Sequence, residues 1–250
     1  MLAFTVAIAM IPLVAAVMAT TVYLHRCRTH RSLELAPRTD WSFRLVIWMT
    51  TGIDVAEWVA VHRKHHAHTD VIGDPHSPLL EGLPQIEFGN VFYYAREARN
   101  KNTVEKFARD ILDGQDWWDK HVFCHQKSGL ALGIALLCLI LGWWGLIAAA
   151  IHAMAYVFIL TPAINGLCHY PHPLGYQHTA EPHARTTFNN FVVAVLTCGE
   201  GLHHNHHWHQ HSARLAHTRL EVLADAGWWV IWVLEKAGLA CNVKTLPLAG

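Results

Sequence analysis

The stretch Leu202–His211 reads LHHNHHWHQH and contains six histidines. Three of them have the spacing i, i+3 and i+4, namely His203, His206 and His207. The same spacing recurs far upstream in a second triplet, His62, His65 and His66. Side chains with this spacing share one face of a helix, and neutral imidazole is a common ligand of transition metals. The two triplets therefore predict a site for more than one metal ion, assembled from distant parts of the chain.

The composition is typical of a membrane protein with a polar portion. Apolar residues make up 52% of the 250 residues and charged residues only 15%, below the level of about 25% in soluble domains. The length suits one domain, which we place at 1–250. With 19 basic and 19 acidic residues the net charge is zero, which argues against nucleic acid as a partner.

The cysteines argue against a disulfide framework and against an iron–sulfur or rubredoxin-like module. They are scattered and form no Cys-x-x-Cys pair: Cys27, Cys124, Cys138, Cys168, Cys198 and Cys241. This pattern predicts a reducing compartment.

Three apolar segments are predicted to cross the membrane. Residues 2–24 contain no charge and are long enough to span a bilayer. Because no basic region precedes them, we expect an uncleaved helix and not a signal peptide. A later apolar block supplies two further segments, 129–142 and 145–168, which meet at the turn Gly142-Trp-Trp-Gly145.

The segment Trp41–Val61 is apolar but contains Arg44, Asp54 and Glu57. Charges within a membrane are costly, so we expect an amphipathic helix that lies at the interface. Topology leads to the same expectation. If this segment crossed the membrane, the histidines before and after it would lie on opposite sides.

The basic residues predict the orientation. All 19 lie in 26–127 or 185–244, and none lies in the turn between the two later spans. By the positive-inside rule, the N-terminus and that turn face outward. The expected fold is thus all-α: three transmembrane helices, interfacial helices, and a histidine-rich catalytic cap in the cytoplasm formed by 25–128 and 169–250.

Other segments read as short helices outside these spans. Phe88–Leu112 predicts one or two amphipathic helices, and Asp116–Asp119 contains two tryptophans typical of an interfacial anchor. Phe188–Cys198 is too short to span, so we expect it along the interface. The part from Arg214 onward predicts an amphipathic helix beside the membrane.

Two further histidine pairs extend the site. His25 and His30 are five residues apart and do not share a face of an α-helix. Either the helix ends between them, or they serve different metals. Asn165 and His169 have the spacing i, i+4. With the triplets, these pairs make nine candidate ligands: His25, His30, His62, His65, His66, His169, His203, His206 and His207.

Nine imidazoles exceed the needs of one metal and suit two metals with positions left open for dioxygen or water. Asn165 could hold a coordinated water. Five carboxylates near the histidines could orient their imidazole N–H groups. These are Asp54, Glu57, Asp70, Asp74 and Glu200.

In order and spacing, these motifs resemble the membrane fatty acid desaturases, in particular the acyl-CoA group that includes the stearoyl-CoA desaturases. The resemblance covers residues 25–207 and rests on HRCRTH at 25–30, HRKHH at 62–66 followed by DPH at 74–76, NGLCH at 165–169, and GEGLHHNHH at 199–207. It implies a di-iron centre held by the nine histidines, with Asn165 holding a water ligand. It also implies dioxygen as co-substrate, desaturation of a fatty acyl chain, and a bent apolar tunnel.

The chain departs from this family pattern in two places. Relatives usually have a pair of helices before the first histidine pair, whereas one fits before His25, so a shortened N-terminus and a minimal subfamily both stay open. His204 stands where relatives usually have Asn. We expect His203 to bind metal in preference to His204, because only His203 shares a face with His206 and His207.

The resemblance also implies partners. Since the chain has no cytochrome, flavin or iron–sulfur signature, electrons must come from a ferredoxin, a rubredoxin or a cytochrome b5-like donor. The acyl group could arrive on coenzyme A, on carrier protein or in a phospholipid. Arg63 and Lys64 could meet a phosphate-bearing headgroup, or they could repel excess cations or contact lipid phosphates.

Two alternatives to a desaturase stay open. A hydroxylase, monooxygenase or acetylenase could use the same site. A membrane protein that binds or transports zinc, copper or nickel is the other class. Transport predicts ionisable groups deep within the spans, where His152 is the main example, so catalysis is favoured.

The remaining histidines are predicted to lie outside the metal site. His152 should be a satisfied polar group near the outer face, and His121 and His125 form a pair without an assigned role. His68 and His76 could support the ligands. The others are expected at the surface or in substrate contacts: His172, His178, His183, His209, His211 and His217.

Overall fold

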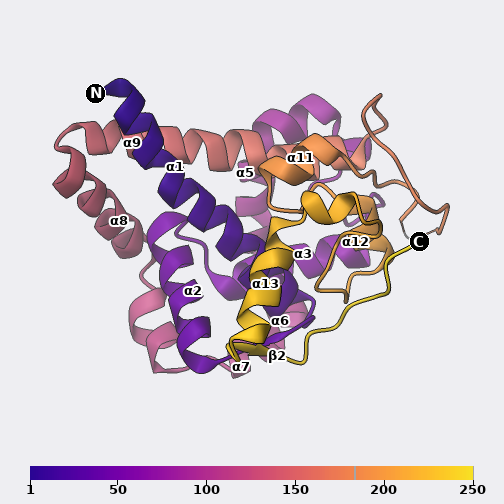
Figure 1. The fold of residues 1–250 in the computed structure, drawn as a ribbon, viewed down its shortest axis with the longest axis horizontal. Coiled ribbons are helices and arrows are strands. Elements are labelled where there is room, and N and C mark those ends of the chain that lie inside the picture. Colours follow the sequence, from indigo (N-terminus) through magenta and orange to yellow (C-terminus); the bar gives the residue numbers. More distant parts are fainter. Residues whose placement is uncertain (183, 250) are drawn as a thin grey trace.

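The computed structural model describes residues 1–182 and 184–249, so the expectation for His183 lies outside the described residues. The first helix, α1 (Leu2–Ala19), continues directly into the π-helical segment η1 (Thr20–Thr29). Figure 1 shows α1 running from the N-terminus at the edge of the molecule toward its centre. There η1 contacts α2, α3 and α13.

A second long apolar helical segment packs across α1. It begins at α9 (Trp144–Ala155) and continues through η3 (Tyr156–Leu160), α10 (Thr161–Asn165) and η4 (Leu167–His169). The preceding helix α8 (Gln126–Leu141) packs beside α9 and α2 (Figure 1). Gly142 takes the positive φ of +62° that this tight turn requires.

Within the described residues, two helices are long and apolar enough to cross a membrane, Leu2–Thr29 and Trp144–His169. In their most apolar windows only 33% and 17% of the residues, respectively, are buried inside the protein. Large apolar side chains thus face outward, an arrangement that suits a protein associated with a membrane. The third predicted span, 129–142, corresponds to α8, which is shorter, and the count of three spans stays a prediction.

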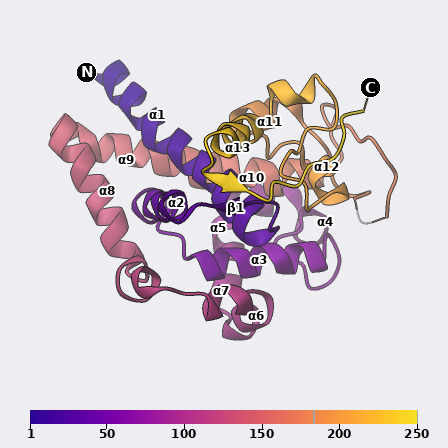
Figure 2. The ribbon, with the colours of Figure 1, turned by 60° about the horizontal axis from the view of Figure 1, so that its bottom comes forward.

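The prediction of one helix over Trp41–Val61 is wrong. The structure has α2 (Pro37–Thr50) and α3 (Val55–Ala67), separated by a break at which Gly52 has a φ of +62°. Asp54 begins α3, because its carboxylate accepts hydrogen bonds from the backbone N–H groups of Ala56 and Glu57 at 2.9 and 3.0 Å. The break turns the chain so that α3 runs beneath η1 (Figure 2).

The next segment is helical, as predicted for Phe88–Leu112. It comprises α4 (Pro78–Glu81), α5 (Leu83–Ala98), α6 (Lys101–Phe107) and α7 (Arg109–Asp113). The tryptophan pair then leads into η2 (Asp119–Phe123). Both indoles are substantially exposed, and their role as a membrane anchor stays a prediction.

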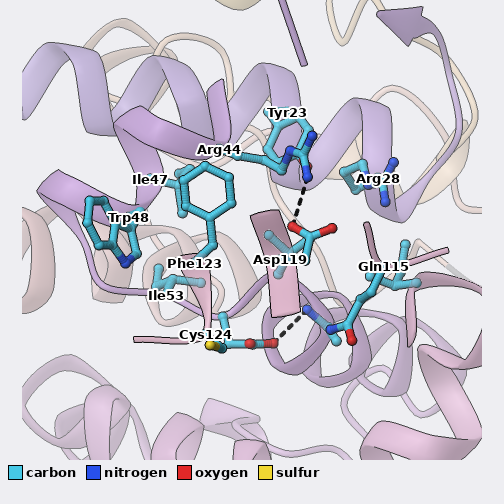
Figure 3. Close-up of a pocket in the computed structure, with 14 residues that line it drawn as sticks. Tyr23, Arg28, Arg44, Ile47, Trp48, Ile53, Gln115, Asp119, Phe123 and Cys124 are labelled. Atoms are coloured by element: carbon cyan, nitrogen blue, oxygen red, sulfur yellow. Dashed lines mark hydrogen bonds and ion pairs between the residues drawn. The ribbon is translucent and has the colours of Figure 1, made fainter. Parts of the chain in front are cut away.

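Arg44 ties η2 to α2. Its guanidinium lies 2.9 Å from Asp119, beside Phe123 (Figure 3). It also lies 2.9 Å from Asp116. The small pocket at this place, about 30 Å³, also includes Trp48 and Ile53. The charge of Arg44, unfavourable in a membrane, is therefore compensated inside the protein.

The C-terminal part forms the cap over η1. Its elements are α11 (Phe191–Leu196), α12 (His203–Trp208), η5 (Glu221–Leu223) and α13 (Ala226–Lys236). β1 (Glu34–Leu35) and β2 (Ala240–Cys241) pair antiparallel, with Glu34 opposite Cys241. The predominance of helix confirms the all-α prediction.

Candidate metal centre

The structure brings the nine predicted histidines together in two neighbouring groups. The five-histidine group contains His25, His30, His62, His66 and His206. The four-histidine group contains His65, His169, His203 and His207. Within each group, one ring nitrogen of every residue lies within 4.8 Å of the others. Seven of the nine side chains are buried, and His62 and His66 are half-buried.

Each histidine triplet contributes to both groups, which differs from the single shared face expected. On α3, His62 and His66 join the five-histidine group and His65 joins the other. On α12, His206 joins the five-histidine group, while His203 and His207 join the other. The two helices therefore lie across both groups and set the distance between them.

The π-helical form of η1 explains how His25 and His30 meet. The backbone N–H of His30 donates to the carbonyl of His25 at 3.1 Å, an i+5 hydrogen bond. This wider turn brings residues five apart toward the same face, so both imidazoles enter one group. The helix therefore does not end between them. The alternative that they serve different metals stays a prediction.

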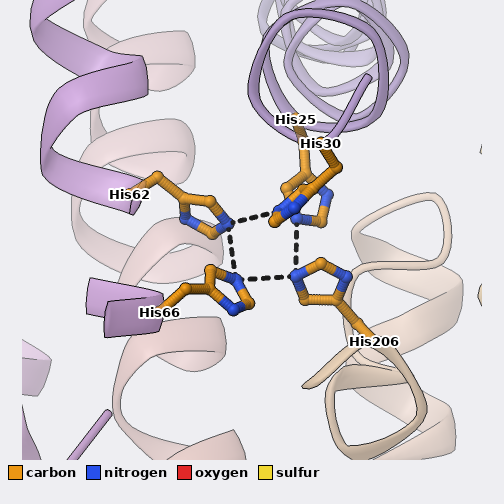
Figure 4. Close-up of side chains that lie close together, drawn as sticks. All are labelled: His25, His30, His62, His66 and His206. Carbon is orange, nitrogen blue, oxygen red and sulfur yellow. Dashed lines mark hydrogen bonds between the residues drawn. The ribbon is translucent and has the colours of Figure 1, made fainter. Parts of the chain in front are cut away.

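The imidazole nitrogens converge closely. In the five-histidine group the Nε2–Nε2 distances are 3.0 Å for His25–His206, 3.2 Å for His30–His62, 3.1 Å for His62–His66 and 2.8 Å for His66–His206 (Figure 4). In the four-histidine group they are 2.8 Å for His169–His203, 3.2 Å for His203–His207 and 3.4 Å for His65–His207.

These spacings fit a shared cation. Two imidazole nitrogens bound to one ion at about 2.1 Å lie about 3.0 Å apart at a right angle and about 3.4 Å apart at a tetrahedral angle. Without a cation, each facing pair of nitrogens could be held only where one of the two rings carries its proton on Nε2; elsewhere two lone pairs would face each other. Both groups could therefore hold a metal ion.

Three buried carboxylates orient three of the histidines. Asp74 accepts from Nδ1 of His65 at 3.0 Å, and Asp70 accepts from Nδ1 of His169 at 2.8 Å. Nδ1 of His25 lies 2.7 Å from Glu200. A carboxylate at Nδ1 keeps the proton there and leaves the Nε2 lone pair directed at the group. Asp70, Asp74 and Glu200 thus lie where the sequence predicts.

Asp54 and Glu57 do not take the predicted position. The carboxylate of Asp54 caps α3 and accepts from Gln126 Nε2 at 3.4 Å. Glu57 faces a cavity beside the site. Its pKa rises to about 7, because it is partly buried and because Asp54 is near. Asp54 lies at the start of α3 and Glu57 in its first turn, so both carboxylates lie one helical turn or more before His62.

Arg63 and Lys64 each bind a carboxylate and are half-buried, and their role at a headgroup stays a prediction. Arg63 donates to the carbonyls of Arg28, Thr29 and Phe107 at 2.9–3.1 Å and pairs with Asp110 at 2.6 Å. Lys64 lies 2.7 Å from Glu97. These bonds attach α3 to η1 and to α5 through α7.

Burial sets the protonation of the site. Burial and neighbouring imidazoles hold the pKa well below its ordinary value in six histidines: His30, His62, His66, His203, His206 and His207. Burial also lowers the pKa of His65, but the Asp74 carboxylate more than offsets this and raises it overall. Most of these imidazoles are therefore neutral at pH 7, the form that binds metal.

Asn165 and His204 point in different directions. Asn165 donates to Asn90 at 3.0 Å and lines the same cavity as His203. His204 is turned away from both groups, since its Nδ1 contacts the carbonyl of Ala184 at 3.0 Å and its Nε2 accepts from the N–H of Thr179 at 3.3 Å. His203, and not His204, lies in a histidine group, which is the choice that the sequence favoured.

The structure also places several of the remaining histidines. Nε2 of His152 contacts the carbonyl of Thr50 at 2.7 Å, and His121 contacts the carbonyl of Trp117 at 2.9 Å. His68 is half-buried. His76 is buried against His65.

A buried ion network was not predicted. Arg26 is 1% exposed, lies 2.8 Å from Asp225 and 3.6 Å from Glu200, and donates to the carbonyl of Ala213 at 2.8 Å. It links η1, the start of α13, and the carboxylate that contacts His25. No local spacing could have revealed it, because the partners lie far apart in the sequence.

An apolar cavity of about 740 Å³ adjoins the site. His25, His62, His76 and His203 lie on its wall. The remaining lining is mainly apolar and comes from α1, α2, α3, α5, α8, α9 and η3. This volume lies within the range of about 300–1,000 Å³ usual for small-molecule sites.

A helical fold, two histidine groups able to hold metal, and an adjoining apolar cavity define a class of metal-binding enzymes that act on apolar chains. The chain belongs to the fatty acid desaturase family, since the family model described as "Fatty acid desaturase" matches residues 2–242.

Three curated relatives show the similarity. An sn-1 stearoyl-lipid 9-desaturase of Synechocystis is 32% identical over 91% of this chain and 67% of its own length. An acyl-CoA 5-desaturase of Anemone leveillei is 32% identical over 92% and 68%. A hex-5-enoyl-[acyl-carrier protein] acetylenase of Moorena producens is 30% identical over 92% and 73%.

The family membership confirms the prediction that this protein is a fatty acid desaturase, an oxidoreductase of lipid metabolism. These relatives are enzymes, which favours catalysis over metal transport.

Proposed function

We propose that the two histidine groups hold two iron ions and that the protein uses dioxygen to place a double bond in a fatty acyl chain. The observation that carries this proposal is the convergence of nine imidazoles in two adjacent groups beside one apolar cavity. Five histidines would hold one iron and four the other. The iron pair, when bound, supplies the activation of dioxygen.

The chain's own residues bind and orient the substrate. The cavity takes the acyl chain, because its walls are mainly apolar and it passes the histidine groups at His25, His62 and His203. The same walls exclude water from the reacting methylenes. Asn165, which donates to Asn90 at 3.0 Å, would hold a water beside the four-histidine group, which has one imidazole fewer than its neighbour.

The reaction balances with an external supply of electrons. Two adjacent methylenes lose two hydrogens, and with dioxygen, two electrons and two protons they give one double bond and two waters. A ferredoxin, a rubredoxin or a cytochrome b5-like protein supplies the electrons. The relatives act on lipid-bound, coenzyme A-bound and carrier-protein-bound chains, so each of these carriers is a candidate here.

The protein lies in a lipid bilayer as one domain. Its two long apolar helices cross the membrane, and α8 is the third span. The outward-facing apolar side chains of these helices support this arrangement. The histidine groups face the cytoplasm and the N-terminus faces outward, because the basic residues all lie on the side of the cap.

A second candidate activity is acetylenase chemistry. The Moorena relative is named as an acetylenase and is 30% identical. Removal of two hydrogens from an existing double bond uses the same site geometry as removal from a single bond. A hydroxylase is the further alternative, since oxygen transfer competes after the first hydrogen is removed.

The experiment is a fatty acid profile from cells that express the chain together with a matched electron donor. Mass spectrometry locates any new double bond. His206→Ala, which lies in the five-histidine group, is the inactive control, and iron per chain is measured on both purified proteins.

A new unsaturated species that only the wild-type chain produces supports desaturation and gives its position. A triple bond or a hydroxyl group moves the assignment to the corresponding alternative. A wild-type protein that is purified folded but binds no iron contradicts the di-iron proposal.

A further inference from the structure

His76 has a buried imidazole whose two nitrogens have no hydrogen-bond partner among the described residues. The residue is 4% exposed and lies in the loop between α3 and α4. Buried polar groups are nearly always hydrogen-bonded, and each exception requires an explanation. Leaving such a group unsatisfied destabilises the folded protein.

Two neighbours, His65 and Asp74, hold His76 in position. Its ring stacks on that of His65 with centroids 4.8 Å apart and planes 19° apart. Asp74 accepts from Nδ1 of His65 and from the backbone N–H of His76, each at 3.0 Å. One carboxylate therefore places both residues, but it bonds only the backbone of His76 and leaves its ring nitrogens without a partner.

The ring also reaches the cavity. His76 lines it together with Asn90, Asn165 and His203. All four of these side chains are polar, whereas the lining from α1, α8 and α9 is mainly apolar. A buried water needs a roomy site with two to four polar partners, and these side chains supply donors and acceptors.

Packing alone does not account for a histidine here. A phenylalanine ring would stack on His65 equally well and would leave no unsatisfied nitrogen. A neutral imidazole offers one donor and one acceptor. The arrangement instead matches a small polar ligand in the cavity, held at the edge of the four-histidine group.

We propose that His76 is a positioning residue that hydrogen-bonds a water molecule, or another small polar ligand, where the cavity meets the four-histidine group. This inference rests on the proposed metal centre. In this proposal His76 is not a metal ligand. It holds the water or small polar ligand that approaches the metal from the cavity side.

The test uses the iron-loaded, oxidised protein with azide as the probe, followed by absorption titration. His76→Phe keeps the stacked ring and removes both nitrogens. His76→Gln restores a hydrogen-bonding group. His68→Phe is the matched control, because His68 lies nearby in the chain and is half-buried, but does not line the cavity. Iron content and melting temperature are measured for every protein.

We expect His76→Phe to keep the iron content of the wild type and to bind azide at least tenfold more weakly. His76→Gln should recover most of the affinity, and His68→Phe should match the wild type. Unchanged azide affinity in His76→Phe overturns this inference and leaves the metal centre in place. Loss of iron in His76→Phe also overturns it, because His76 would then be a metal ligand. A folded wild type without iron overturns the metal centre and this inference together.

Discussion

At the scale of single residues, buried carboxylates decide how the histidines face. Asp74, Asp70 and Glu200 each contact one imidazole at Nδ1. Burial alone would raise the pKa of a carboxyl group. Here the facing histidines outweigh burial, so the pKa of each of the three lies below its ordinary value. The carboxylates therefore stay charged and keep the Nε2 atoms available.

Asp74→Asn should weaken metal binding. The amide keeps the shape but loses the charge that holds the proton on Nδ1 of His65, so we expect a 10- to 100-fold loss of iron affinity. Competition with a chelator of known affinity measures it. Asp113→Asn is the control, because Asp113 is exposed in its pair with Arg109. Equal affinity in both variants would contradict the orienting role.

Glu57 should make stability depend on pH. Its pKa is raised from 4.5 to about 7, first by burial and then by Asp54. The unfolded chain releases this proton near pH 4.5, whereas the folded protein keeps it up to about pH 7. The contribution to stability is thus complete below pH 4.5 and is lost as the pH rises through 7.

Glu57→Gln should remove that dependence. Between pH 5.5 and 8 in detergent, the melting temperature of the variant should fall less than that of the wild type. Glu105→Gln, at an exposed glutamate of α6, should behave as the wild type does. If the melting temperatures of the wild type and of Glu57→Gln fall by the same amount over this pH range, the carboxyl group of Glu57 does not cause the pH dependence.

At the scale of elements, η1 is held in the cap by the ion network around Arg26. The guanidinium lies between Asp225, at the start of α13, and Glu200, which contacts His25. Asp225 also accepts from the backbone N–H groups of Trp228 and Leu215. Arg26 therefore stabilises the junction of η1 and α13 and also fixes Glu200, the carboxylate that contacts His25.

Arg26→Met should destabilise the protein by about 3–5 kcal/mol, because it leaves two buried carboxylates without their cation. Denaturant unfolding in mild detergent measures the free energy. Arg31→Met is the matched control, since Arg31 forms an exposed pair with Asp110 that should contribute about 0–1 kcal/mol. A similar small loss in both variants would show that the network adds little.

Gly133 allows α8 to pack closely on α2. A Cβ atom there would overlap the carbonyl oxygen of Met49, so the helices could not keep their distance. Gly133→Ala should cost about 1–3 kcal/mol in the same unfolding assay. Gly89→Ala, within α5 and with an ordinary neighbour contact, should instead stabilise by about 0.5–1 kcal/mol. Stabilisation by both variants would contradict the close packing.

At the scale of the whole molecule, the cavity is a product of several distant helices. Ile11 of α1, Leu137 of α8 and Ala149 of α9 line the same space as His203 of α12. The cavity therefore connects the apolar helices to the histidine groups, and we expect its length to decide which acyl chain fits.

Ala149→Phe should shorten the acyl chain that the protein accepts, because the ring fills part of the cavity. The product profile should shift toward shorter chains, with iron content unchanged. Ala150→Phe is the matched control, since Ala150 is exposed beside it and its ring should leave the profile as it is. Identical profiles from Ala149→Phe and the wild type would place the acyl chain elsewhere.

Local sequence patterns predicted most of the histidine site and the first helix. The i, i+3, i+4 triplets identified His62, His65, His66 and their partners on α12, because helical spacing depends on nearby residues alone. The long uncharged run before His25 predicted a helix for the same reason. The break between α2 and α3 was not predicted. A single glycine, Gly52, within an apolar run does not reveal that a new helix begins with Asp54 as its cap.

The sequence by itself determined that the protein is helical, apolar along two long stretches, and provided with nine histidines suited to metal. The tertiary structure alone decided how they divide into groups of five and four, that η1 widens to admit both His25 and His30, and that Arg63 and Lys64 each bind a carboxylate. It also decided which carboxylates reach an imidazole. The physical reason is that spacing fixes which side chains share one helical face, whereas partners far apart in the chain meet only when the helices pack.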